Sequence, residues 1–193
     1  MNTFLNPFRA PSRNEAEWFS AGVASSFPDV GLDETGTESE SSNPKLCGIR
    51  GPDAKPGCKV FHVPKTNAPQ RAEIEVVGDD LAAQDLTDQV LVFQYRGKFH
   101  AIDHASAVAD VTQQCPHSSY PLSQGIPFDI EDFGIVLSAG LTCPKHNWSF
   151  DLFSGRADRG NYKLKVWEVQ LRDIVGTQID DKEVWVRRKP RIG

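Results

Sequence analysis

Two short cysteine–histidine pairs constrain this chain more than any other feature of its sequence. Cys115 and His117 enclose a single proline, and Cys143 and His146 enclose a Pro-Lys dipeptide. Because 25 residues separate His117 from Cys143, the pairs belong to two loops that the fold has to bring together. Each pair follows a strand-like run, and the proline in each pair stiffens its loop.

Two cysteines and two histidines at these spacings can hold either of two metal centres. A tetrahedral zinc site commonly uses such a set, with about two to four residues between paired ligands. In one type of [2Fe–2S] cluster, two histidines replace two cysteines on one of the irons. The single residue between Cys115 and His117 is awkward for two ligands of one tetrahedral ion, and it suits ligands of neighbouring irons. The spacing therefore favours the cluster over zinc.

The sequence around both pairs resembles the Rieske family of [2Fe–2S] proteins. Two segments carry the resemblance, Cys115–Gly125 (CPHSSYPLSQG) and Thr142–Gly155 (TCPKHNWSFDLFSG), and it extends over roughly residues 58–188. The resemblance implies one [2Fe–2S] cluster per chain and no catalytic residue beyond its ligands. It also implies that the ligand histidines face solvent and the electron partner. The ligands that it implies are Cys115, His117, Cys143 and His146.

The chain departs from the respiratory-chain members of that family. Those proteins join the two loops by a disulfide, whereas the matching positions here are Tyr120 and Lys145. Their serine and tyrosine hydroxyls after the second histidine correspond to Trp148 and Phe150. The resemblance therefore implies the low-potential ferredoxin class. The interval between the loops is also long, and its extra stretch Ile126–Gly134 is expected to be an acidic flap near the cluster or an enlarged loop.

From Lys59 onward the sequence predicts strands, which are short runs rich in branched and aromatic residues. Turn signals separate them, and among these Arg96-Gly97 indicates a tight hairpin and Ala139-Gly140 a further turn. The expected strands are Lys59–Val63, Ala72–Val77, Val90–Tyr95, Phe99–Ile102, Ile135–Leu137, Trp148–Phe150, Leu164–Val169 and Glu183–Val186. This pattern predicts an all-β fold, an antiparallel sandwich or barrel, and the resemblance places the two ligand loops at its tip.

The first part of the chain, residues 1–56, differs from the domain that we expect over residues 57–190. The stretch Asp29–Asn43 is rich in Gly, Ser, Thr and acids and offers little to bury, which predicts a poorly ordered tail. Aromatic and apolar residues in Glu15–Phe27 fall near helical spacing. A short helix lying on the domain is favoured there, with a partner-binding motif or a disordered stretch as the alternatives.

The remaining bulk features concern compartment and partners. Cys47 and Cys58 lie outside the ligand pairs and are expected to be free thiols. No apolar run approaches the length of about 18 residues that a membrane helix needs, and the N-terminus lacks the apolar run of a secretory signal. We therefore expect a cytoplasmic protein, with the mitochondrion as the weaker alternative. The net charge of −5 does not indicate nucleic-acid binding, and a monomer is expected.

Together these features predict one-electron transfer, by a ferredoxin-like carrier or by the electron-transfer subunit of an oxidoreductase with separate redox partner proteins. The loops most resemble free-standing Rieske ferredoxins and the small subunit of assimilatory nitrite reductases. Ring-hydroxylating oxygenases need a further catalytic domain, and only 47 residues follow His146. The alternative is a non-redox binding or assembly module that retains the Rieske fold.

Overall fold

The computed structural model describes residues 18–32, 45–50, 55–63, 73–74, 89–103, 120–174 and 181–189. Their strands are β1 (Phe19–Val23), β2 (Ile49–Arg50), β3 (Lys55–Pro56), β4 (Cys58–His62), β5 (Glu73–Ile74), β6 (Gln89–Tyr95), β7 (Lys98–Asp103), β8 (Ile126–Asp132), β9 (Ile135–Cys143), β10 (Trp148–Asp151), β11 (Trp167–Asp173) and β12 (Lys182–Arg188). Two single-turn 3-10 helices, η1 (Ala24–Ser26) and η3 (Leu122–Gln124), complete the described elements. None of the described helices is long and apolar enough to cross a membrane.

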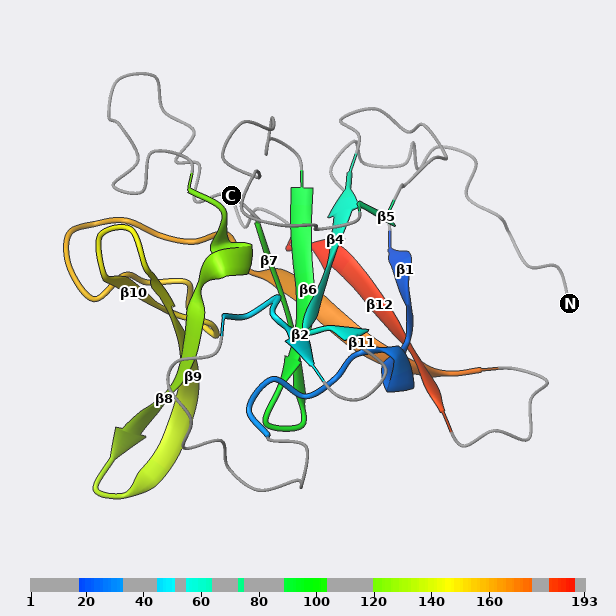
Figure 1. Ribbon diagram of the computed structural model, residues 1–193, viewed down its shortest axis with the longest axis horizontal. Coiled ribbons are helices and arrows are strands. Elements are labelled where there is room, and N and C mark those ends of the chain that lie inside the picture. Colours follow the sequence, from blue (N-terminus) through cyan, green and yellow to red (C-terminus); the bar gives the residue numbers. More distant parts are fainter. Residues whose placement is uncertain are drawn as a thin grey trace, which may run out of the picture.

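The described strands form three antiparallel sheets of three or four strands each, and Figure 1 shows how they are arranged. The central sheet has the strand order β5-β4-β6-β7, the second has the order β1-β12-β11, and the third has the order β10-β9-β8. A short β2-β3 pair accompanies them. The described elements confirm the all-β fold that the sequence predicts.

Strand β6 lies at the centre because both of its faces are buried. Val90 and Val92 belong to the apolar core shared with β1 and β12. Leu91 and Phe93, which point to the opposite face, belong to the core shared with β9 and β10. Side chains alternate between the two faces of a strand. A strand with both faces buried therefore needs a continuous run of apolar residues, as β6 has.

The central sheet and the second sheet join through the chain that leads into β11. The Asp103 amide donates to the carbonyl of Lys165 at 3.1 Å, and the Trp167 indole donates to the Asp103 carboxylate at 2.8 Å. A further antiparallel bridge pairs Ile102 with Val166. These bonds connect β7 to the chain that leads into β11, so the two sheets are joined at this edge.

Several predicted strands have other bounds in the structure. Strand β9 continues through Ala139-Gly140, where the sequence predicts a turn, so that prediction is wrong. Glycine at position 140 has a packing reason, because a Cβ there would collide with the ring of Phe128 across the β8–β9 pair. The Arg96-Gly97 hairpin is confirmed, with φ of 47° and 73° in the left-handed region.

The N-terminal aromatic residues form a strand and not the expected helix. Strand β1 pairs antiparallel with β12, and Phe19 packs edge-on against Phe61 and Trp167 at centroid distances of 5.7 and 6.3 Å. The division of the chain at residues 56 and 57 stays a prediction. Residues 18–32 nevertheless contribute side chains to both cores, so they are not an irregular tail.

The stretch Ile126–Gly134 was expected to be an acidic flap near the cluster or an enlarged loop, and in the structure it is one arm of a regular hairpin. It forms β8 and the Phe133-Gly134 turn of the β8–β9 hairpin. The register pairs Ile126 with Thr142 and Asp132 with Ile135, so the hairpin runs away from the loop after Cys143. Figure 1 shows it projecting at the lower left.

We expect Phe19→Ala to destabilise the protein by about 3–5 kcal/mol, because it removes a ring that is 2% exposed and contacts two other aromatic rings. Val23→Ala is the matched control on the same strand, since Val23 is 39% exposed and should cost little. Urea unfolding measures both variants. Equal stability of the two variants would show that β1 does not pack as described.

His100 makes the stability dependent on pH. Its ring stacks on Phe93 at 5.4 Å, and burial, followed by the charge of Lys98, lowers its pKa from 6.5 to about 4. A lowered histidine pKa stabilises the fold fully above pH 6.5, and this contribution disappears as the pH falls toward 4. The free energy of unfolding should therefore fall less between pH 6.5 and pH 4 in His100→Phe than in the unmodified protein, and the difference should be at most about 3 kcal/mol. Parallel curves for the two proteins would contradict this assignment.

Candidate metal centre

The second cysteine–histidine pair lies in a tight loop between β9 and β10. The Asn147 amide donates to the Cys143 carbonyl at 2.9 Å and closes the loop. Asn147 has a φ of 55°, a left-handed conformation that asparagine adopts more readily than most residues. Cys143 is fully buried, whereas His146 is exposed. One donor of this pair therefore faces the core and the other faces the surface.

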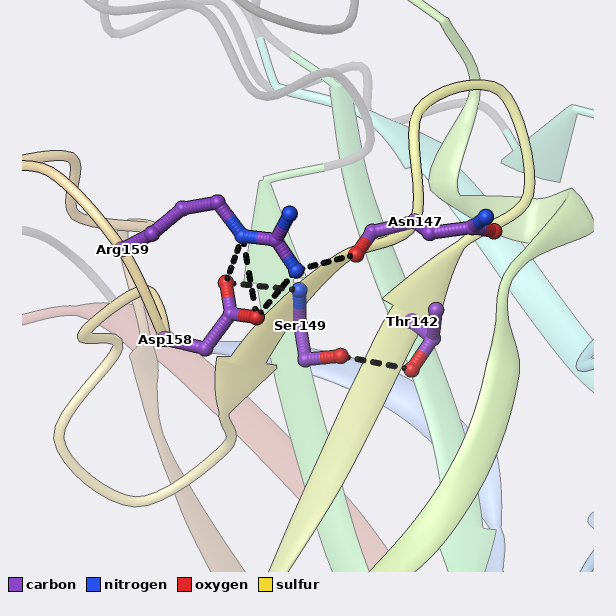
Figure 2. Close-up of polar contacts among 5 residues, drawn as sticks. All are labelled: Thr142, Asn147, Ser149, Asp158 and Arg159. Atoms are coloured by element: carbon purple, nitrogen blue, oxygen red, sulfur yellow. Dashed lines mark hydrogen bonds and ion pairs between the residues drawn. The ribbon is translucent and has the colours of Figure 1, made fainter.

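Asp158 and Arg159, which lie on the segment after β10, hold this loop in place through polar contacts, as Figure 2 shows. The Arg159 guanidinium donates to the Asn147 carbonyl at 3.0 Å. Asp158 accepts a bond from the Ser149 amide at 3.2 Å and forms an ion pair with Arg159 at 2.6 Å. The hydrogen bond from Arg159 holds the pKa of Asp158 below its ordinary value. These contacts fix the residue that directly follows His146.

Aromatic side chains support the same loop. The Arg159 guanidinium lies over the Trp148 ring at 5.7 Å, and Tyr162 meets that ring edge-on at 4.9 Å. Phe150 is buried in the core below. Trp148 and Phe150 thus place aromatic packing beside the second loop, at the positions where the sequence indicates that hydroxyl donors are missing.

The second loop also touches the end of the first. Lys145 places its ammonium 5.8 Å from the centre of the Tyr120 ring. Such cation–π contacts stabilise by about 0.5–1 kcal/mol at exposed sites. By the resemblance of the two loops, Tyr120 and Lys145 match the inter-loop disulfide of the respiratory-chain proteins, and a non-covalent contact joins them in this chain.

The first pair, Cys115 and His117, lies outside the described residues. Among the residues that are described, no group of three or more His, Cys, Asp or Glu side chains is arranged to hold a metal. Only Cys143 and His146 can thus be placed. A buried sulfur and an exposed imidazole on one tight turn suit a cluster that has one side in the protein and one side at its surface. The described half of the donor set therefore fits the cofactor.

The expectation that Cys47 and Cys58 are free thiols is wrong, because the structure joins them in a disulfide. The Cys47 amide also donates to the Ser123 carbonyl at 3.0 Å, and the Leu46 amide donates to the Gly125 carbonyl at 2.7 Å. The disulfide therefore fixes to β4 a segment that binds the end of the first ligand loop.

Sequence reasoning missed Asp158 and Arg159 as well as this disulfide. The available signal for the disulfide was the pairing of two cysteines left over once the ligand pairs are assigned. Nothing in the local sequence around Arg159 indicates that it reaches the carbonyl of Asn147, because that contact depends on how the segment after β10 folds back.

Comparison with known proteins places the chain in a family. Residues 58–168 match the Rieske [2Fe–2S] domain. This range spans more than half of the chain and includes both cysteine–histidine pairs. The protein belongs to the Rieske [2Fe–2S] domain family, and a [2Fe–2S] cluster is its cofactor.

The other comparisons add less. No curated protein sequence matches the chain. A crystal structure from Mycobacterium tuberculosis, of a protein proposed to be the small subunit of an NADH-dependent nitrite reductase, is similar at a TM-score of 0.45 and 16% sequence identity. The match covers 91% of this chain and 98% of that one.

We expect reduction of the Cys47–Cys58 disulfide to lower the free energy of unfolding by about 3 kcal/mol, since a closed loop of this size constrains the unfolded chain by that amount. Denaturant unfolding with and without a phosphine reductant measures the change. Cys47→Ser is the control, because the reductant should leave its stability unchanged. Two alkylatable thiols at these positions in the unreduced protein would disprove the disulfide.

Proposed function

We propose that this chain transfers single electrons through a [2Fe–2S] cluster bound by Cys115 and His117 of the first loop and by Cys143 and His146 of the second. When bound, such a cluster accepts and releases one electron at a time. The observation that supports this most directly is the opposite exposure of Cys143 and His146 on one turn. The cysteine anchors the site in the core, and the histidine gives a partner a short path from the surface.

The remaining residues of the site position the two loops. The Asn147–Cys143 hydrogen bond and the Arg159 guanidinium hold the second loop in its conformation. The Lys145–Tyr120 contact brings the end of the first loop toward it. A redox centre benefits from such rigidity, because a fixed environment reorganises little when one charge is added.

The ligand set also suggests the potential. Two ferric ions, two sulfides and two thiolates sum formally to zero, whereas four thiolates would give a dianion that resists an electron. Histidine ligation therefore raises the potential above the roughly −400 mV of plant-type clusters. Trp148 and Phe150 lack the hydroxyl groups that bond the cluster sulfurs in the respiratory-chain proteins, which favours the low end of the Rieske range, about −150 mV.

We further propose that the chain works as a ferredoxin-like carrier or as the electron-transfer subunit of an oxidoreductase, with separate proteins as electron donor and acceptor. A nitrite-reductase-like role, which rests on the resemblance of the two loops, and a cytoplasmic location, which rests on the N-terminal sequence and the lack of a long apolar run, are the finer forms of this proposal. The alternative, a non-redox module that keeps the fold, is disfavoured because a complete set of four donors is present in the sequence.

Visible absorption and electron paramagnetic resonance of the anaerobically purified protein test the proposal. We expect a Rieske signature that is lost in His117→Ala and in His146→Ala, since each removes one ligand of the same iron. His62→Ala is the matched control, because His62 is exposed on β4 and the nearest cysteine in the sequence, Cys58, is held in the disulfide with Cys47. Voltammetry should give a midpoint near the low end of the Rieske range.

Three outcomes would contradict the proposal or a part of it. Purified protein that contains stoichiometric zinc and no iron would exclude the cluster as the working centre. An unchanged spectrum in either ligand variant would show that the residue in question does not bind it. A midpoint above about +100 mV, well inside the Rieske range, would mean that other donors reach the cluster sulfurs.

A further inference from the structure

Exposed cations lie in the loop that carries His146 and on the segments bonded to β10. Lys145 precedes the histidine in the loop, and Arg159 is bonded to the carbonyl of the residue that follows it. Arg156 and Lys163 lie on the neighbouring segments, and all four side chains are exposed. We call the set of Lys145, Arg156, Arg159 and Lys163 the basic rim.

Backbone bonds tie these segments to the site. The Asp151 amide at the end of β10 donates to the Arg156 carbonyl at 2.9 Å, and the Asp158 amide donates to the Ser149 carbonyl at 2.8 Å. An antiparallel bridge then pairs Arg156 with Lys163. The basic rim is therefore part of the same sheet that ends in the ligand loop, and it is held in a fixed position relative to His146.

The pairing of Arg156 with Lys163 is unfavourable for the fold. Like charges directly opposite each other on antiparallel strands are destabilising. No carboxylate among the described residues forms an ion pair with either side chain. Elsewhere in the described part, a cation can face an acid on the neighbouring strand, as Arg187 of β12 faces Glu168 of β11. The fold gains nothing from two unneutralised cations here, so they point to an anionic group outside the chain.

The sign of the rim is opposite to that of the molecule. The whole chain carries a net charge of −5, and the acids Glu131 and Asp132 are exposed near the tip of the β8–β9 hairpin, which runs away from the ligand loop. Opposed charges on two ends of a protein orient it in the field of a charged partner.

We propose that the basic rim is the docking surface for the redox partner, and that the partner presents a cluster of Asp and Glu side chains to it. This inference rests on the proposed function, because it takes the exposed His146 as the point where electrons leave. A protein surface is favoured over a nucleic acid, since four cations on a chain of net negative charge are too few for a phosphate backbone.

Small oxidants of opposite charge test the sign of this surface without the partner. The protein is reduced with dithionite, excess reductant is removed, and the oxidation rate is followed by stopped-flow absorption. One electron passes to ferricyanide, a trianion, which becomes ferrocyanide, and no bond forms and no proton moves. The same experiment with tris(phenanthroline)cobalt(III), a trication, gives a second rate. The ratio of the two rates cancels changes of driving force that affect both oxidants alike.

We expect ferricyanide to react faster as the ionic strength falls from about 0.15 M to about 0.01 M, where the Debye length grows from about 8 to about 30 Å. The trication should show the opposite trend. If the net charge of −5 governed the reaction, both trends would be reversed. Reversed trends, or rates that do not depend on ionic strength, would overturn the inference.

Charge reversal then identifies the residues. Lys163→Glu should lower the ratio of the ferricyanide rate to the cobalt rate by about three- to tenfold at low ionic strength. Because it places an acid opposite Arg156, its melting temperature should stay the same or rise. A slower reaction therefore cannot come from damage to the fold. Arg156→Glu should behave in the same way.

Lys98→Glu is the matched control, with the same change of charge at an exposed position on the β6–β7 hairpin. It should leave the ratio unchanged. A ratio that is the same in the Lys163 variant and the unmodified protein would overturn the docking surface while leaving electron transfer intact. A protein that neither oxidant reoxidises would instead refute the proposed function, so the two failures are distinguishable.

Discussion

The burial of both faces of β6 is the constraint on which the rest of the structure depends. Val90 and Val92 face the core formed with β1 and β12, while Leu91 and Phe93 face the core formed with β9 and β10. Neither outer sheet could bury its apolar face without this central strand. The packing against Leu91 and Phe93 places Cys143 at the inner end of β9, where its sulfur is fully buried.

The site follows from that placement. Strand β9 ends inside the core at Cys143, and the chain must return to form β10 within four residues. The turn closes on the Cys143 carbonyl through the Asn147 amide, and this leaves His146 at the surface. Inside and outside donors thus result from a strand that ends in the core and a turn that leaves it. Arg159 acts on this turn from a segment that is itself bonded to β10, so one sheet supplies both the loop and its support.

Local sequence predicted those parts of the structure that depend on local chemistry. The Arg96-Gly97 hairpin was predictable because a tight turn needs two residues with positive φ. The two cysteine–histidine pairs were recognisable because metal ligands have short and specific spacings. Strand β1 was misread as a helix because the residues of its partner, β12, with which it pairs lie 160 or more positions away along the chain. Gly140 was misread as part of a turn because the group that requires a glycine there, the Phe128 ring, lies on another strand.

The cations of this protein are of two kinds, those that the fold pairs with an acid and those that it leaves opposite another cation. Several cations in the described part, such as Lys165 beside Asp103 at 3.2 Å, form an ion pair with an acid that the fold supplies. Arg156 and Lys163 face one another, and the register that opposes them is set by the bonds that join their segments to β10. An acid at either position would satisfy the same backbone register at lower electrostatic energy. The choice of two cations therefore has no explanation within the fold, and it is accounted for by a group that approaches from solvent beside His146.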